Sequence, residues 1–180
     1  REYLETYDRE QPWFCWVSFG GPHEPWDAPT PYANMYDPAA MPSPVPCPET
    51  CSPPEETVLH RRFAKRPDLT PEDTAAMRAN YAGNVTLIDD QIGELLDLIE
   101  RRGELDNTVI AFTSDHGELN GDFGLIYKSC FLDGCLRVPL IVRTPQTASG
   151  EHAGTVCCSP VEWMDVGPTL VELGGADRFP

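Results

Sequence analysis

The sequence predicts an α/β domain in which a mainly parallel sheet is flanked by helices. Three short apolar runs, at residues 12–19, 108–114 and 138–142, are bounded by proline, glycine or polar residues, as buried strands commonly are. Between the first two runs, residues 70–102 have the apolar periodicity of a helix. Strands that alternate with helices are typical of parallel sheets, and this order sets the predicted fold class.

The first strand is expected at residues 12–19, where aromatic residues lie between Pro12 and a pair of glycines. A long excursion follows from Pro25 to Pro71, and six of the residues from 41 to 54 are proline. Proline lacks the amide donor and disfavours helix in the preceding residue, so we expect an irregular loop. Loops of this length in compact domains often cover functional sites, and we interpret this one as a substrate-side loop.

The helix after this loop has a clear start and end. Thr70 supplies an N-cap hydroxyl, Pro71 stands at the first helical position, and two acids follow it. One apolar stripe runs along the helix through Tyr81, Val85, Ile88, Ile92, Leu95 and Ile99. Arg101-Arg102-Gly103 ends it. Gly83 and Gly93 each cost about 1 kcal/mol relative to alanine, which indicates close packing or a break.

The remaining elements follow from turn and capping residues. Asp106-Asn107 makes the turn into the second expected strand, and a further short strand is expected at residues 155–159. Pro168 is tolerated only in the first turn of a helix, where the amides have no intrahelical partner. The last helix is therefore expected to begin near Asp165, with this residue as its N-cap.

Length and composition limit what the chain can be. Its 180 residues suffice for one domain. A net charge of -16 argues against a nucleic-acid partner, whose phosphates require a basic face. No apolar run approaches the roughly 20 residues that cross a bilayer, and the first residues do not form a signal peptide, so we expect no membrane partner. The seven cysteines do not have the spacing of a zinc site. Their number and positions identify neither a disulfide nor the redox compartment of the protein.

Polar side chains follow the predicted strands at the points where the strands end. Asp115 and His116 come directly after the 108–114 run, His23 follows the first strand, and Lys128 lies in the next loop. In an open α/β sheet, functional groups collect at strand ends. We therefore predict a site for an oxyanion and a metal. The plainer alternatives are a turn-capping aspartate, a hydrogen-bonded loop histidine and a surface lysine.

These residues also carry a resemblance to a known family. The segments share order and spacing with the second half of a sulfatase of the alkaline-phosphatase superfamily: Pro22–Pro25, Tyr81–Gly93, Ser114–Glu118, Gly121–Leu125 with Lys128, Arg137–Ile141 and Asp165–Leu170. The resemblance implies a partial alkaline-phosphatase-like fold, and we expect residues 1–180 to form a single partial domain with a proline-rich loop at about 25–71.

The resemblance also implies roles for the four candidate residues. Asp115 and His116 would hold a divalent metal, Lys128 would contact the sulfate oxygens, and His23 would lie against the bridging oxygen of the ester. Calcium (Ca2+) is the first expectation because many sulfatases use it. Manganese (Mn2+) is the alternative, because imidazole is a better ligand for it. The expected substrate is a sulfated small molecule or a sulfated glycan.

The nucleophile is not expected in this chain. Sulfatases form formylglycine from the first residue of Cys/Ser-x-Pro-x-Arg, and the segment beginning at Cys51 comes close to this pattern. Glu55 stands at the arginine position, where a carboxylate would repel sulfate, so Cys51 is predicted not to be the nucleophile. Formylglycine and the remaining acidic ligands are expected upstream of Arg1. By itself the chain is then expected to lack turnover.

Two other functions fit the same residues. The first is a phosphonate monoester or phosphodiester hydrolase of the same superfamily, whose motif the adjacent pair Asp115-His116 also resembles. A non-catalytic binding or vestigial domain would explain the absence of a nucleophile. An incomplete sheet would expose an edge, so a homo-oligomer is a further expectation. The sequence leaves localisation open, although the family is often periplasmic or secreted.

Overall fold

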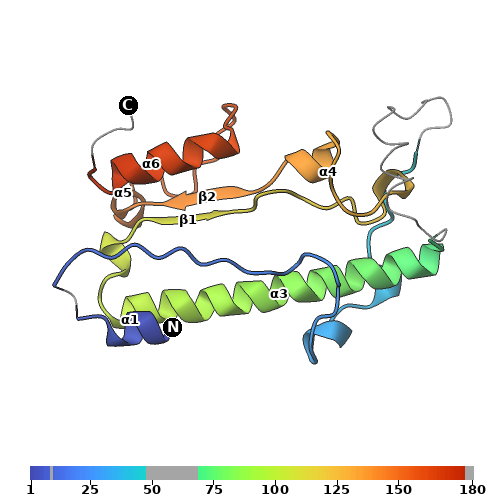
Figure 1. Cartoon of the computed structure of the whole chain (residues 1–180), viewed down its shortest axis with the longest axis horizontal. Helices are drawn as coiled ribbons and strands as arrows, with labels where there is room; N and C mark the ends of the chain where they lie inside the picture. The colour runs from blue at the N-terminus through green and yellow to red at the C-terminus, as the bar shows by residue number, and fades with distance from the viewer. Residues whose placement is uncertain (9, 48–68, 177–180) are drawn as a thin grey trace.

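The computed structural model describes residues 1–8, 10–47 and 69–176. Figure 1 shows a small sheet, formed by β1 (Ile110–Thr113) and β2 (Leu140–Arg143), between α6 (Val166–Leu173) on one side and α3 (Pro71–Arg101) on the other. Five shorter pieces connect or flank these elements: α1 (Glu2–Thr6), η3 (Leu105–Asn107), η4 (Asp122–Gly124), α4 (Asp133–Leu136) and α5 (Pro145–Ala148). None of the helices in the described ranges is long and apolar enough to span a bilayer.

The predicted long helix is confirmed as α3. Its N-terminus is a reciprocal capping box, in which Thr70 Oγ1 accepts from the Asp73 amide at 3.1 Å and the Asp73 carboxylate accepts from the Thr70 amide at 3.0 Å. Pro71 occupies the first helical position. Gly103, in the left-handed region at φ 69, follows the C-terminus. Both ends therefore lie where the sequence predicts them.

The described part of the proline-rich loop packs against α3. It contains two short 3-10 turns, η1 (Tyr32–Asn34) and η2 (Pro38–Ala40), and Tyr32 donates its hydroxyl to Asp90 at 2.7 Å. A Cβ added at Gly83 would lie 2.3 Å from the Tyr32 carbonyl oxygen, so the predicted close packing is confirmed there. Gly93 has no neighbour within 4 Å of such an atom. Residues 48–68, which include Cys51, lie outside the described residues.

Two small hydrophobic clusters hold the chain together at opposite ends. In the first, Leu4 of α1 packs with Leu98 and Ile99 of α3. In the second, Leu119, Leu125 and Cys135 are buried together within the connection between β1 and β2. The second cluster is the support on which the candidate site lies.

The parallel sheet predicted from the sequence is wrong for the strands that the structure describes. β1 and β2 pair antiparallel, with Ile110 opposite Arg143 and Thr113 opposite Leu140. A parallel pair needs a crossover that carries the chain from one end of the sheet to the other. The connection from 114 to 139 contains only η4 and the four-residue helix α4, and the chain returns beside the strand end that it left.

The predictions of strands at residues 12–19 and 155–159 are also wrong. Residues 12–19 and 155–159 are described, but neither segment has the ladder bonding of a strand. Phe14 is 73% exposed and Trp16 is 66% exposed, whereas the aromatic run predicted burial on both faces. An apolar run shows that a segment favours burial, but it does not say which neighbour would provide the covering surface.

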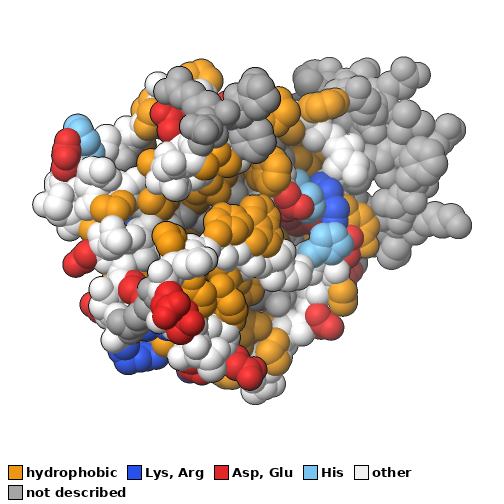
Figure 2. Space-filling view, turned by 60° about the vertical axis from the view of Figure 1, so that its left-hand side comes forward, with side chains coloured by type: hydrophobic (Ala, Val, Ile, Leu, Met, Phe, Trp, Pro, Cys, Tyr) orange, Lys and Arg blue, Asp and Glu red, His pale blue; other side chains and the backbone are white. Residues whose placement is uncertain are grey.

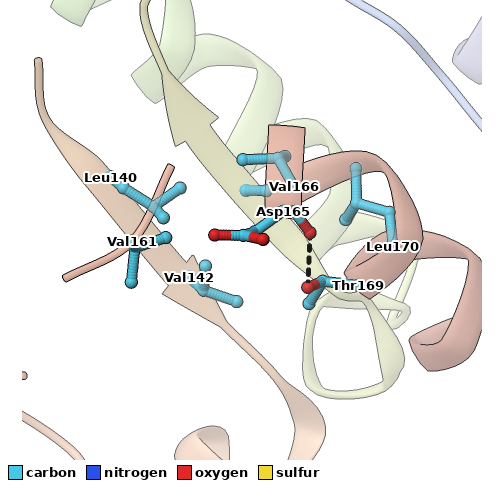
Figure 3. A pocket seen from close by; sticks show the side chains of 8 residues that line it. Leu140, Val142, Val161, Asp165, Val166, Thr169 and Leu170 are labelled. Carbon is cyan, nitrogen blue, oxygen red and sulfur yellow. Dashed lines mark hydrogen bonds between the residues drawn. The ribbon is translucent and has the colours of Figure 1, made fainter. Parts of the chain in front are cut away.

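The last helix begins where the sequence predicts it. Asp165 occupies the N-cap position of α6 and ends a 3-10 turn, η5 (Trp163–Asp165). Its carboxylate accepts from the Glu162 amide at 2.8 Å, so it caps η5 instead of α6. Figure 3 shows a shallow pocket between α6 and the sheet, where Thr169 donates to the Asp165 carbonyl at 2.7 Å. Its lining is mainly apolar: Ala111, Leu140, Val142, Val161, Asp165, Val166, Thr169 and Leu170.

Candidate active site

The turn after β1 holds Asp115 and His116 against α4. The Gly117 amide donates to the Cys135 carbonyl at 2.8 Å. A Cβ at Gly117 would lie 2.0 Å from the Gly134 carbonyl oxygen, so no other residue fits without moving the backbone. Ser114 donates its hydroxyl to the His116 carbonyl at 2.7 Å. The strand end is therefore fixed by backbone contacts, which leave the side chains of Asp115 and His116 available.

The hydrogen bonds around His116 determine which ring nitrogen is available. Nδ1 lies 2.9 Å from the Gly117 carbonyl oxygen, which can only accept, so the ring proton is on Nδ1. The other ring nitrogen, Nε2, lies 3.8 Å from Oδ2 of Asp115. A metal-bound histidine usually donates its other ring nitrogen to a carbonyl or carboxylate in this way. The donor set, one imidazole nitrogen and one carboxylate oxygen, fits a divalent cation.

These two side chains can form only part of a metal shell. Within the described ranges, no group of three or more histidine, cysteine, aspartate or glutamate side chains could hold a metal ion. Asp115 Oδ1 accepts from the His116 amide at 3.0 Å, while the Asp115 side chain is 77% exposed. Further oxygen ligands would have to approach from this open side.

Lys128 reaches the segment that leads into the proline-rich loop. Its ammonium lies 3.1 Å and 3.3 Å from the two carboxylate oxygens of Glu24 and also contacts Nε2 of His23. An ammonium only donates, so Nε2 of His23 accepts, and the ring proton is on Nδ1, 2.9 Å from the Glu24 carbonyl oxygen. Lys128 therefore bridges the His23 ring and the Glu24 carboxylate.

The structure brings all four sequence-predicted site residues to one end of the sheet. The ring centroids of His23 and His116 are 6.1 Å apart in an edge-on arrangement. Lys128 contacts His23 although 105 positions separate them in the sequence. Figure 2 shows histidine, basic and acidic side chains gathered on one face, beside hydrophobic surface. The ammonium of one residue, two imidazoles and the carboxylate of Asp115 therefore face one region. Together these groups can bind an anionic ester and polarise it.

Sequence reasoning missed Glu24. It lies between His23 and Pro25, and only its proximity to His23 could have drawn attention to it. Burial raises its pKa, but a backbone hydrogen bond and the contacts with Lys128 and His23 outweigh burial and hold the pKa below the usual value. Glu24 is thus ionised at neutral pH and orients the ammonium of Lys128.

The backbone around Lys128 is in an uncommon conformation. Its two neighbours, Tyr127 at φ 69 and Ser129 at φ 74, are non-glycine residues in the left-handed region. Such residues cluster at functional sites, where surrounding contacts hold them in place. The Tyr127 ring stacks on Trp26 with a centroid distance of 5.8 Å. This stacking ties the Lys128 loop to the segment that carries His23.

α3 supports the same loop through Arg78. Its guanidinium donates to the carbonyl oxygens of Asn120 at 2.9 Å and Pro42 at 3.1 Å, and it forms an ion pair with Asp122. Asp122 also accepts from the Val45 amide at 2.8 Å. One arginine therefore joins the long helix, the proline-rich loop and the loop of the site.

Glu118 is a half-buried acid beside the site. Its Oε1 accepts from the amides of Asn120, at 3.1 Å, and Tyr127. Burial raises its pKa, and the negative charge of Glu24 adds to this effect. The two amide bonds oppose burial without cancelling it, so the pKa of Glu118 lies above the usual value. Glu118 positions the backbone immediately before Lys128.

We expect Glu118→Gln to change how stability depends on pH. The raised pKa means that the stability contributed by Glu118 is fully present below its usual pKa of 4.5 and is lost as pH rises through the folded pKa. Glutamine keeps an acceptor for the two amides and has no such proton to lose. The variant should therefore gain stability relative to the parent protein as pH rises from about 4 to about 8, measured as urea midpoints. A difference that does not vary with pH would contradict this role.

The fold and the site define the class of protein. The structure superposes on a phosphonate monoester hydrolase from Silicibacter pomeroyi with a TM-score of 0.81 and 32% sequence identity, covering 98% of this chain and 37% of that chain. The chain therefore has an alkaline-phosphatase-like fold, although the full parallel sheet is not seen in the described part.

Within this class, the chain belongs to the sulfatase family, which it matches over residues 1–176. The choline-sulfatase of Rhizobium meliloti (strain 1021) is 33% identical over 172 residues, covering 93% of this chain and 32% of the relative. The arylsulfatase of Clostridium perfringens (strain 13 / Type A) is 30% identical over 182 residues, covering 96% of this chain and 36% of the relative. The resemblance stated from the motifs is confirmed. The chain spans about a third of the length of these relatives.

Proposed function

We propose that the chain supplies part of the active site of a sulfuric ester hydrolase of the arylsulfatase type. The observation that supports this most is the convergence of Lys128, His23 and His116 at one strand end. Family membership supports hydrolysis of an ester, and the site supplies positive charge for an anionic group in a strongly acidic chain. A sulfated small molecule or glycan is the substrate class that fits.

Lys128 and His23 would contact the sulfate ester directly. The ammonium of Lys128 would bind the non-bridging oxygens, on which negative charge is concentrated, and would exchange its contact with His23 for one with the ester. Nε2 of His23 would then be free to face the bridging oxygen. The alcohol leaves through cleavage of the sulfur–oxygen bond, and it needs a proton on that oxygen, which a protonated His23 could provide.

Asp115 and His116 would hold the divalent metal. Nε2 of His116, whose Nδ1 contacts the Gly117 carbonyl, and the exposed carboxylate of Asp115 would supply the ligand atoms. When bound, the metal supplies Lewis-acid polarisation of the ester oxygens. Calcium is the first expectation and manganese the alternative, because an imidazole ligand suits manganese better. Formylglycine is the proposed nucleophile, from a part of the protein outside residues 1–180.

The first test compares two substrates with the complete protein. We expect hydrolysis of a nitrophenyl sulfate at a higher kcat/KM than hydrolysis of a phenyl phosphonate, because the chain belongs to the sulfatase family. Added EDTA should remove the activity, and calcium or manganese should restore it. A clear preference for the phosphonate would overturn the sulfatase proposal in favour of the alternative.

The alternative is a phosphonate monoester or phosphodiester hydrolase. A specific observation favours it: a solved structure that this chain resembles at a TM-score of 0.81 is a phosphonate monoester hydrolase. The adjacent pair Asp115-His116 also resembles the corresponding motif of that branch. A non-catalytic binding domain is the third possibility, and failure to hydrolyse either ester despite bound metal would favour it.

A further inference from the structure

Two cysteines follow Lys128, one before α4 and the other within it. Cys130 is half-buried and Cys135 is 4% exposed, and their sulfur atoms are 3.6 Å apart. Both are free thiols in this structure. Neither belongs to the set of residues proposed to bind the ester or the metal. We infer that Cys130 and Cys135 form a reversible disulfide that ties the Lys128 loop to the turn beneath Asp115 and His116.

The distance between the two sulfur atoms is short enough for this bond to form. A disulfide has a sulfur–sulfur distance of about 2.05 Å, so the two atoms have to approach by roughly 1.5 Å, which side-chain rotation can provide. Cys135 is fixed by its backbone, because its amide donates to Leu132 at 2.8 Å and its carbonyl accepts from Gly117 at 2.8 Å. Cys130 is therefore the residue that moves.

The chemistry needs an oxidant, and a small disulfide such as oxidised glutathione serves. The more exposed thiolate of Cys130 attacks the small disulfide, forms a mixed disulfide and releases one small thiol. Cys135 then attacks the sulfur of Cys130 as its proton leaves, and the second small thiol departs. The two cysteines lose two electrons and two protons, and the small disulfide gains them. A dithiol reductant reverses the reaction.

The bond would fix the contact between two parts of the site. Lys128 lies two positions before Cys130, and the Cys135 carbonyl holds the Gly117 amide that follows His116. Closing the disulfide joins these two segments covalently, in addition to the packing of Leu119 and Leu125 with Cys135. The inference rests on this placement and stands even if the proposed substrate is wrong.

Peptide mapping of the complete protein tests the inference. Trypsin cleaves after Lys128 and Arg137, so one peptide, residues 129–137, contains both cysteines. After incubation with oxidised glutathione and alkylation, we expect this peptide to be unalkylated and lighter by two hydrogen atoms. The exposed Cys15 should instead carry glutathione or the alkylating group.

Two single variants make the test decisive. In Cys135→Ser, glutathione should remain on Cys130, because the thiol that would displace it has been removed. In Cys130→Ser, the buried Cys135 should resist both oxidant and alkylation in the folded protein. Recovery of peptide 129–137 with both cysteines alkylated, in a sample where Cys15 has reacted, would overturn the inference. A bond from Cys130 to any other cysteine would overturn it as well.

Discussion

Asp115→Ala is expected to lower kcat/KM of the complete protein on the order of a thousandfold and to weaken its binding of divalent metal. Lewis-acid stabilisation is worth several kcal/mol, and each ~1.4 kcal/mol is a factor of ten in rate. Replacing a residue that hydrogen-bonds to a metal ligand typically weakens metal binding by roughly tenfold to hundredfold. Loss of a direct ligand should weaken it by at least as much. Calorimetric metal titration and steady-state kinetics on a nitrophenyl sulfate measure the two effects.

Asp133→Ala is the matched control for this variant. Asp133 is an exposed aspartate on α4, in the same connection between β1 and β2, and it pairs only with Arg137 across one helical turn among the ion pairs of the described residues. Its replacement should leave both metal affinity and rate unchanged. Unchanged metal affinity in Asp115→Ala itself would mean that Asp115 is not a ligand, and the metal site would have to be assigned elsewhere.

Lys128→Ala is expected to reduce kcat by about 10²–10³, the usual cost of removing one group that stabilises charge in the transition state. The effect on stability should be far smaller. Lys128 and Glu24 are partly exposed, so their ion pair contributes roughly 0–1 kcal/mol. A large loss of rate with an almost unchanged urea midpoint is therefore the expected combination.

Two further variants distinguish a direct contact between Lys128 and the substrate from general electrostatic attraction. Arg137→Ala removes an exposed cation from the same connection and should have no effect on rate. Lys128→Arg keeps the charge but replaces a compact ammonium with a planar guanidinium, so it should recover only part of the activity. If Lys128→Ala and Arg137→Ala reduce the rate equally, general electrostatic attraction explains the data, and a direct contact between Lys128 and substrate is excluded.

The long helix could be predicted from sequence because its information is local. Thr70, Pro71 and Asp73 determine the start, and a repeating apolar stripe determines the length. The four candidate residues could also be selected from sequence, because family motifs include all four and the end of β1 precedes Asp115 and His116. Local signals of this kind do not depend on what the rest of the molecule contributes.

The sheet could not be predicted in the same way because strand pairing is non-local. The apolar run at residues 138–142 predicts a strand, but its direction depends on the path of the connection, which here includes only the short α4. The aromatic run at 12–19 predicts burial, whereas Phe14 and Trp16 are exposed in the described part of the chain. Glu24 was missed for a related reason: its partner, Lys128, is 104 positions away.

The close contacts along α3 restrict how its length could change during evolution. Arg78 binds the site loop, Gly83 meets the Tyr32 backbone, and Leu98 packs on α1 at the far end. Each inserted residue would turn everything beyond it by about 100° and shift it by about 1.5 Å. A single insertion between Arg78 and Leu98 would therefore misdirect one end of the helix, so descendants of this gene should vary in length in their loops and keep α3 at a constant number of residues.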